Sequence, residues 1–457
     1  MNFRRALFRL RDKKIRVLDF LFLKMACGVT NLRRNYRPPQ MPSTSPDTMD
    51  KYSHPLFSTS PGFLPAGPAM VLAPLFAIAM AFCQAVQAAP ITPGNLVIFR
   101  AGSGTNSLAN TGNEVFLDEY TTAGSIVQSI AMPSTGSGTK LVTAGTQTAE
   151  GALSISPDGT WLGFAGYNAT IPAGSSITVG NSTAVPRVVG LFNTTTGSYS
   201  LTVTGTWFSA SSPRAAVTTD GNKIWAVGGN SGVVYGTVDN SSPFVASGTT
   251  ANTAAIGTNL RTLGVYGNEI YVSTGSGTLP TVGRLAGDPI LNGLPTSSTF
   301  LPNIPRQGGT PVTSRYGFTF LDVNPDVAGI DTRYTVDDSA TSGGLWKYTL
   351  NNSGTWNAAG SITALTGALR GLTGGLDGTN VKLFMTGSGN TLWAYTDTAA
   401  VTSVLSGTLA AFTSLATAST NTAFRGIALV VPEPSTALLG GLGLLIAYIL
   451  FRRRKTS

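Results

Sequence analysis

The sequence predicts an all-β fold, a six-bladed β-propeller followed by a single C-terminal transmembrane helix. Three observations support this prediction. The middle of the chain is rich in Gly, Ser, Thr, Val and Ala in short alternating stretches, which favours strands and turns. A hairpin pattern recurs along this region, which is typical of repeat architectures. Near the C-terminal end, an uncharged apolar run is followed by four cations, as in a membrane segment.

The recurring hairpin consists of a strand, a tight turn at Asp-Gly or Gly-Asn, and a second strand that ends in glycine. Such turns need positive φ angles, which Gly and Asn adopt readily. The pattern occurs at residues 153–167, 215–229, 262–275 and 371–387. A third strand follows it, as in 344–350 ("GLWKYTL") and 391–397 ("TLWAYTD"), and then a weaker fourth strand. Four antiparallel strands per repeat predict a propeller blade. A flat sandwich is the alternative, although it would not need repeats.

The blades can be counted from a charged residue at the head of each first strand. Glu150 marks one first strand, and arginines mark five others: Arg214, Arg261, Arg315, Arg370 and Arg425. The last of these strands, 424–431, has no further strands after it, whereas 95–133 contains three strands without a first. We therefore expect 424–431 to complete the N-terminal blade and to protect its edge. This gives six blades, or seven if residues 276–312 contain an irregular blade.

The repeated arginines are also the first candidate site. If the first strands line a central channel, these side chains form a ring near one mouth of the channel. Such a ring would bind an anion or an acidic glycan. The alternative is structural: each arginine pairs with the backbone or a carboxylate of a neighbouring blade and holds the blades together.

An acidic segment at residues 321–339 is the second candidate site. Asp322, Asn324 and Asp326 have the spacing of the first ligands of a calcium loop. The segment lacks the glycine at position six and the glutamate at position twelve of such a loop. A structural Ca²⁺ ion is one interpretation, and a solvated acidic turn is the other. Paired carboxylates here would also admit glycosidase chemistry. No other cofactor is expected.

The N-terminal region predicts export. Residues 71–82 form an apolar stretch, and Val86-Gln87-Ala88 is a small-residue cleavage site, so a cut after Ala88 would leave Ala89 first. We therefore interpret residues 49–88 as a signal peptide region. Residues 1–48 hold eleven Lys/Arg and three Asp. They are interpreted as a basic extension outside the mature protein, with translation starting internally. A long basic n-region is the alternative.

The C-terminal segment has three parts. Val431, Pro432, Glu433 and Pro434 are followed by an uncharged run at 437–451, and then by a cation cluster of Arg452, Arg453, Arg454 and Lys455. As a helix, the run would be about 22 Å long, which is short for a bilayer but extendable by snorkelling arginines. The cations would stop at the cytoplasmic side. A buried core helix with a basic tail is the alternative.

This three-part segment resembles the sorting signal of the PEP-CTERM family, over about 25 residues. The resemblance places the sorting signal at 432–457, after a propeller domain at 89–431. It implies that an exosortase-type enzyme of a Gram-negative bacterium processes the chain. The protein would first be anchored in the inner membrane by its C-terminal helix, facing the periplasm. It would then reach the cell surface or the extracellular matrix.

Charge and residue usage narrow the function. The net charge is +9, but residues 1–88 hold 12 cations and 4 anions, whereas 89–451 hold 14 cations and 17 anions. The mature domain therefore offers no basic surface for nucleic acid. Cys27, Cys83 and His54 all precede Ala88, which excludes Ser-His-Asp and Cys-His chemistry from the mature domain. We expect a non-catalytic propeller that binds extracellular glycan or protein. The alternative is an exported hydrolase or lyase that acts on polysaccharide with carboxylates.

Overall fold

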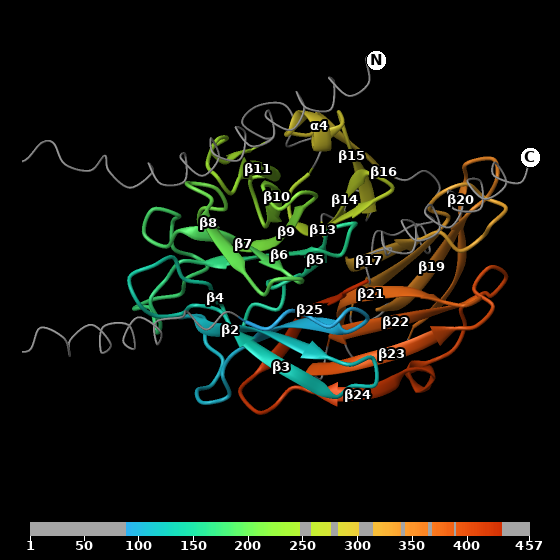
Figure 1. The fold of residues 1–457 in the computed structure, drawn as a ribbon, viewed down its shortest axis with the longest axis horizontal. Helices are drawn as coiled ribbons and strands as arrows, with labels where there is room; N and C mark the ends of the chain where they lie inside the picture. The colour runs from blue at the N-terminus through green and yellow to red at the C-terminus, as the bar shows by residue number, and fades with distance from the viewer. Residues whose placement is uncertain are drawn as a thin grey trace, which may run out of the picture. The chain divides into compact units, whose positions relative to one another are not determined.

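In the computed structural model, the chain divides into two compact units, Met1–Met80 and Ala81–Ser457. The residues that the structure describes all belong to the second unit; they are 88–246, 257–275, 282–300, 314–339, 343–363, 368–387 and 390–431. Apart from a short α-helix, α4 (Pro289–Asn292), and a 3-10 turn, η3 (Leu409–Ala411), their regular structure is β-strand (Figure 1). No helix within these ranges is long and apolar enough to cross a membrane, and the predicted span at 435–451 lies outside them.

Four sheets contain four antiparallel strands each, in sequence order. The β9–β12 sheet consists of β9 (Pro213–Thr218), β10 (Lys223–Gly228), β11 (Val233–Thr237) and β12 (Val245–Ala246). The β13–β16 sheet consists of β13 (Leu260–Tyr266), β14 (Glu269–Thr274), β15 (Val282–Ala286) and β16 (Ser297–Phe300). The β17–β20 sheet consists of β17 (Arg315–Leu321), β18 (Thr332–Asp337), β19 (Gly344–Leu350) and β20 (Trp356–Ile362). The β21–β24 sheet consists of β21 (Leu369–Asp377), β22 (Asn380–Gly387), β23 (Thr391–Asp397) and β24 (Thr413–Thr417).

A nine-stranded sheet contains two further groups of four strands. One group is β25 (Ala423–Leu429), β1 (Leu96–Ala101), β2 (Asn113–Tyr120) and β3 (Ile126–Ala131). The other is β5 (Ser154–Ile155), β6 (Trp161–Tyr167), β7 (Arg187–Asn193) and β8 (Tyr199–Val203). The two-residue strand β4 (Val142–Thr143) joins them, because it pairs with both β2 and β6.

The C-terminal strand completes the N-terminal group, as the sequence predicts. Leu96 of β1 lies opposite Leu429 of β25, and Ile98 lies opposite Ile427. The backbone N–H of Gly94 donates to the carbonyl oxygen of Val430 at 2.7 Å. Figure 1 shows β1 and β25, which stand far apart in the sequence, side by side. The predicted pairing of residues 424–431 is therefore confirmed.

Most first strands are bulged at one shared position. In β9, β13, β17, β21 and β25, the register with the neighbouring strand shifts by one residue at the head of the first strand. A bulge leaves one residue out of the ladder and turns its side chain in a new direction. The bulges include Arg214, Arg261, Tyr316, Arg370 and Arg425.

Neighbouring groups meet through their first strands, in the cyclic order β5, β9, β13, β17, β21, β25 and back to β5. A hydrogen bond from Thr262 Oγ1 to the Tyr316 carbonyl at 3.0 Å connects β13 with β17, and one from Gly426 N to the Gly151 carbonyl at 2.8 Å connects β25 with the segment before β5. Glycine permits this close approach, since a Cβ on Gly317 would lie 2.6 Å from the Arg370 carbonyl oxygen. Apolar clusters fill the space between adjacent sheets. The all-β prediction is confirmed, and the arrangement is that of a β-propeller.

Candidate functional site

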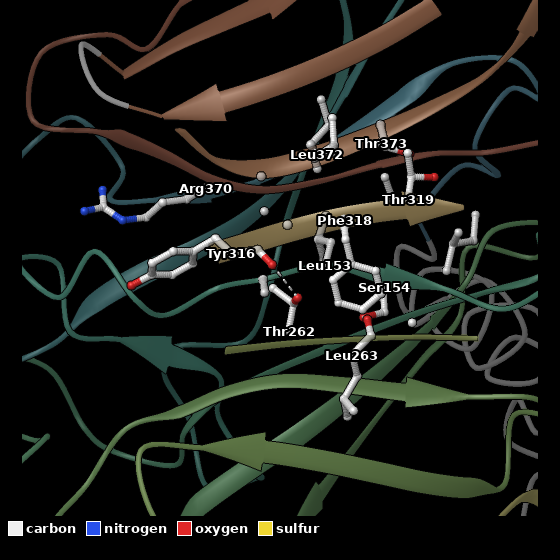
Figure 2. Close-up of a pocket in the computed structure, with 18 of the residues that line it drawn as sticks. Leu153, Ser154, Thr262, Leu263, Tyr316, Phe318, Thr319, Arg370, Leu372 and Thr373 are labelled. Carbon is white, nitrogen blue, oxygen red and sulfur yellow. Dashed lines mark hydrogen bonds between the residues drawn. The ribbon is translucent and has the colours of Figure 1, made fainter. Parts of the chain in front are cut away.

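A cavity of about 600 Å³ is lined by residues of β5, β13, β17, β21 and β25, the first strands other than β9. Its wall combines apolar side chains, such as Leu153, Phe318 and Leu372, with hydroxyl groups and exposed backbone at glycines. In Figure 2, Tyr316 and Arg370 lie together on one side of the cavity, and Thr319 and Thr373 lie on the other side. The cavity is therefore apolar in its middle and carries a cation and an aromatic ring at one end.

Tyr316 is the centre of a charged cluster at that end. The guanidinium carbon of Arg261 lies 3.9 Å from the centre of the Tyr316 ring, and that of Arg370 lies 5.4 Å from it. Asp338 Oδ2 lies 3.5 Å from Arg261 Nη1 and 3.2 Å from Arg370 Nη2. One carboxylate thus bridges two guanidinium groups that both contact one phenol ring. We call Arg261, Tyr316, Arg370 and Asp338 the tyrosine clamp.

The sequence predicts that Arg315 belongs to the ring of arginines at the heads of the first strands. In the structure, Tyr316 occupies the bulged position at the head of β17. Arg315 lies opposite Asp337, at the register position that Leu369 takes opposite Gly387 in the β21–β24 sheet. The residue that follows is the bulged one, so Tyr316 in β17 corresponds to Arg370 in β21. Arg315 instead points into an interface between sheets. The small residue after each bulge could have given the correct alignment, because Gly317 and Gly371 fall in step, as do Thr262 and Gly426 in the other repeats.

Arg214 and Arg425 contact the backbone of neighbouring segments. Arg214 Nη1 donates to Asn259 Oδ1 at 2.6 Å and to the carbonyl oxygen of Leu260 at 3.0 Å. Arg425 Nη2 donates to the carbonyl oxygen of Gly145 at 2.6 Å, and burial lowers the pKa of Arg425 to about 10. The Arg214 contact joins β9 to the start of β13, and the Arg425 contact joins β25 to the segment between β4 and β5, yet Nε of each arginine has no hydrogen-bond partner.

Glu150 is buried, and both of its carboxylate oxygens accept hydrogen bonds. It accepts hydrogen bonds from the Tyr167 hydroxyl at 2.6 Å, from Thr143 Oγ1 at 2.9 Å and from the Ala144 backbone N–H at 2.9 Å. Burial raises the pKa of Glu150, and these hydrogen bonds oppose that effect. Glu150 therefore anchors the segment before β5 to the strands beside it.

The acidic segment after β17 forms a hydrogen-bonded turn. Asn324 Oδ1 accepts from the backbone N–H of Asp326 at 3.1 Å, and Asp331 accepts from the backbone N–H groups of Val323 and Asn324. Asp322 and Asp326 are exposed. In the described ranges, no group of three or more His, Cys, Asp or Glu is placed to hold a metal ion.

The residues next to the two predicted processing sites differ in their surroundings. Ala88 is half-buried and Ala89 is exposed, Gln128 Nε2 donates to the Pro90 carbonyl at 3.2 Å, and the Ile91 N–H donates to the Thr194 carbonyl at 2.7 Å. Val431 is 50% exposed. The sorting residues 432–434 and the cation cluster 452–455 lie outside the described residues.

The C-terminal segment has a recognised counterpart. Residues 430–455 match the PEP-CTERM protein-sorting motif. The chain carries a PEP-CTERM sorting motif. The resemblance predicted from the sequence is thus confirmed, and the motif implies an exported, membrane-processed protein of a Gram-negative bacterium that an exosortase handles. A search of curated proteins found no match to the chain.

Several solved structures resemble this chain distantly. The periplasmic gluconolactonase PpgL of Pseudomonas aeruginosa is 14% identical, with a TM-score of 0.38 over 66% of this chain and 78% of that chain. A Bacteroides thetaiotaomicron protein of unknown function is 12% identical, with a TM-score of 0.35 over 65% and 80%. The Dos1 propeller is 10% identical, with a TM-score of 0.36 over 57% and 62%. The fold assignment rests on the strand pairings themselves.

Proposed function

We propose that this chain is an exported six-bladed propeller that binds an acidic glycan, without catalysis, at the end of the cavity where the tyrosine clamp lies. The observation that carries this proposal is the clamp itself, in which two guanidinium groups contact one phenol ring beside a cavity lined by first strands. The cyclic contacts of six first strands support the blade number. An aromatic ring beside cations suits a sugar that carries a carboxylate.

The balance of charge and donors favours an anionic ligand. Arg370 and Arg425 line the cavity, and Arg261 lies behind them in the clamp, whereas Asp338 is the carboxylate of the clamp and Glu150 is occupied by its own hydrogen bonds. Arg261 Nη1 is paired with Asp338, but Nε of Arg261 has no hydrogen-bond partner, nor has Nε of Arg214 or Arg425. Unused guanidinium donors bind carboxylates strongly, with charge-assisted hydrogen bonds.

Binding is favoured over hydrolysis by the state of Glu150. A glycosidase needs one carboxyl group as an acid and a second as a base or nucleophile across the scissile bond. Both oxygens of Glu150 already accept hydrogen bonds from Tyr167, Thr143 and Ala144. Asp338 is likewise shared between Arg261 and Arg370. These carboxylates hold the structure, which suits a binding site.

The second part of the proposal is the route by which the protein reaches the cell surface or the matrix. The signal sequence would be removed after Ala88, and the segment at 435–451 would hold the protein in the inner membrane on the periplasmic side. Exosortase processing at the PEP-CTERM motif would then release it to the cell surface or the matrix. Val431, the second residue after the last described strand, is exposed, which leaves the start of the motif accessible to an enzyme.

The test measures binding of a polyuronate oligosaccharide and a neutral glucan to the full chain by calorimetry. Arg370 is the more accessible cation of the clamp, with its side chain 24% exposed against 12% for Arg261. Arg370→Gln should weaken polyuronate binding about tenfold or more, because a charge-assisted hydrogen bond contributes about 1.5–3 kcal/mol. The control Arg284→Gln removes an exposed guanidinium paired with Glu269 and should leave binding unchanged. Equal binding of both glycans by the unaltered protein would refute the proposal.

A further inference from the structure

One face of the β17–β20 sheet carries polar side chains in a buried position. Arg333, Thr335 and Asp337 alternate along β18, so their side chains lie on the same face. Cross-strand pairing places Tyr348 opposite Arg333 and Trp346 opposite Thr335 on that face. This face packs against the β13–β16 sheet, because Trp346 and Tyr348 share an apolar cluster with residues of β14 and β15. We call it the arginine face.

The arginine face has several donors without acceptors. Nε, Nη1 and Nη2 of Arg333 have no hydrogen-bond partner, and the residue is 0% exposed. Nη1 of Arg315, Nε1 of Trp346 and Oγ1 of Thr335 are also buried without a partner. Native proteins satisfy nearly all buried polar atoms, so this concentration on one sheet face points to a missing acceptor.

Cation–π contacts fix the guanidinium groups without supplying that acceptor. The guanidinium carbon of Arg333 lies 4.0 Å from the centre of the Tyr348 ring, and that of Arg315 lies 4.4 Å from the Trp346 ring. Arg315 Nη2 donates to the Tyr348 hydroxyl at 3.3 Å. Tyr348 therefore contacts both arginines and holds them near each other.

The charges on this face do not balance. Arg315 and Arg333 are two cations, and the carboxylate beside them is Asp337, 3.5 Å from Arg315 Nε. Burial lowers the pKa of Arg333 to about 9, which shows how unfavourable its charge is in this position. Guanidinium groups nevertheless stay protonated in proteins, so the excess positive charge needs a counter-ion.

We propose that the arginine face binds one buried halide-type anion, chloride in the cell exterior, between Arg333 and Arg315. A monovalent anion neutralises the one excess positive charge on this face, whereas a divalent oxyanion would leave the face with a net negative charge. A spherical ion accepts hydrogen bonds from guanidinium, hydroxyl and indole donors in any direction, as Arg333, Thr335 and Trp346 require. The ion would act as a structural part of the interface between the β13–β16 and β17–β20 sheets.

The first measurement compares thermal unfolding of the full chain, in a nonionic detergent, in equal concentrations of sodium chloride and sodium gluconate. An ion that binds only the folded state stabilises it, so chloride should raise Tm by about 3 °C relative to gluconate. Bromide should do the same. A crystal soaked in bromide should give an anomalous peak between Arg315 and Arg333.

Arg333→Met tests the assignment of the site, because methionine fills similar space without donors. This variant should unfold at the same temperature in chloride and gluconate and should lose the bromide peak. The matched control Arg284→Met removes an exposed arginine, 43% exposed, and should keep both effects. Equal Tm of the unaltered protein in the two salts, or bromide peaks only elsewhere, would overturn the proposal even if Arg333→Met failed to fold.

Discussion

The two faces of the β17–β20 sheet both bury charged side chains, but they differ in the partners that these side chains have. On the face toward the β21–β24 sheet, Lys347 Nζ lies 2.8 Å from Asp397 Oδ2 and donates to the Ala400 carbonyl at 2.6 Å. Ser403 and the Tyr334 hydroxyl, both at 2.5 Å, also donate to Asp397. On the arginine face, Arg333 is equally buried but has no hydrogen-bond partner.

The difference shows how closely two environments can coexist in one sheet. Arg333 and Tyr334 are neighbours in sequence, as are Trp346 and Lys347, and strand alternation sends each pair to opposite faces. On the face that carries Lys347, the charges are balanced within the protein, because Lys347 of β19 is paired with Asp397 of the β21–β24 sheet. The arginine face has buried donors without an acceptor among the residues that the structure describes, which is why we proposed an anion there.

Removing the lysine should produce the largest effect. Lys347→Met would leave Asp397 buried without its cation, and breaking a buried pair in this way costs about 3–5 kcal/mol of unfolding free energy. Urea denaturation of the full chain measures the loss. The double variant Lys347→Met with Asp397→Leu should recover much of it, since no charge is then stranded. A single variant as stable as the unaltered protein would show that the two faces do not differ in this respect.

Acid titration should give a smaller effect at Asp337 of the arginine face. Burial raises the pKa of Asp337, and Arg315 together with backbone N–H groups opposes this shift. The raised pKa means that the folded state favours the protonated acid. Stability from this group is therefore greatest below the unfolded pKa of about 3.9 and falls as pH rises through the folded pKa.

Asp337→Asn should remove that part of the pH dependence, which unfolding midpoints between about pH 3.5 and 7 would reveal. The same series for an Asp377→Asn control, at an exposed pair with Lys382, should keep the slope. A slope of opposite sign for the unaltered protein in this range, insensitive to Asp337→Asn, would contradict the assignment.

The smallest effect is expected at an exposed ion pair. Arg284 and Glu269 lie 2.8 Å apart on neighbouring strands, with side chains 43% and 40% exposed. Such pairs contribute about 0–1 kcal/mol, because water screens the charges. Arg284→Ala should change the urea midpoint of the full chain only slightly. A loss as large as that of Lys347→Met would mean that exposure does not set the scale of these interactions.

The sequence predicted features that depend on local pattern. Hairpin turns such as the one at Asp220-Gly221 are recognisable because positive φ angles restrict the residues that can form them. The pairing of β25 with β1 followed from counting strands, since one end lacked what the other end supplied. The short strand β4, which links two strand groups, has only two residues and gave no comparable pattern.

The site was harder to predict because it depends on bulges and on packing between sheets. One extra residue per first strand moves Tyr316 into the position where Arg315 was expected. The polar alternation of Arg333, Thr335 and Asp337 is typical of a face toward water, and only the neighbouring sheet buries it. The order of blades around the ring and the register between them are not encoded in any single strand.

The pairing of β1 with β25 also has a consequence for the order of export and folding. On the proposed export route, in which the N-terminus crosses the inner membrane first, β1 would be delivered early and β25 last, so the edge of β1 would stay open until transport of the domain is nearly finished. Val430 and Val431 follow β25 directly and begin the segment that the exosortase reads. On that route, closure of the last sheet would coincide with arrival of the sorting motif at the membrane. A chain truncated before that moment would keep an unpaired edge open to periplasmic proteases, and only a complete protein would be both folded and ready for release.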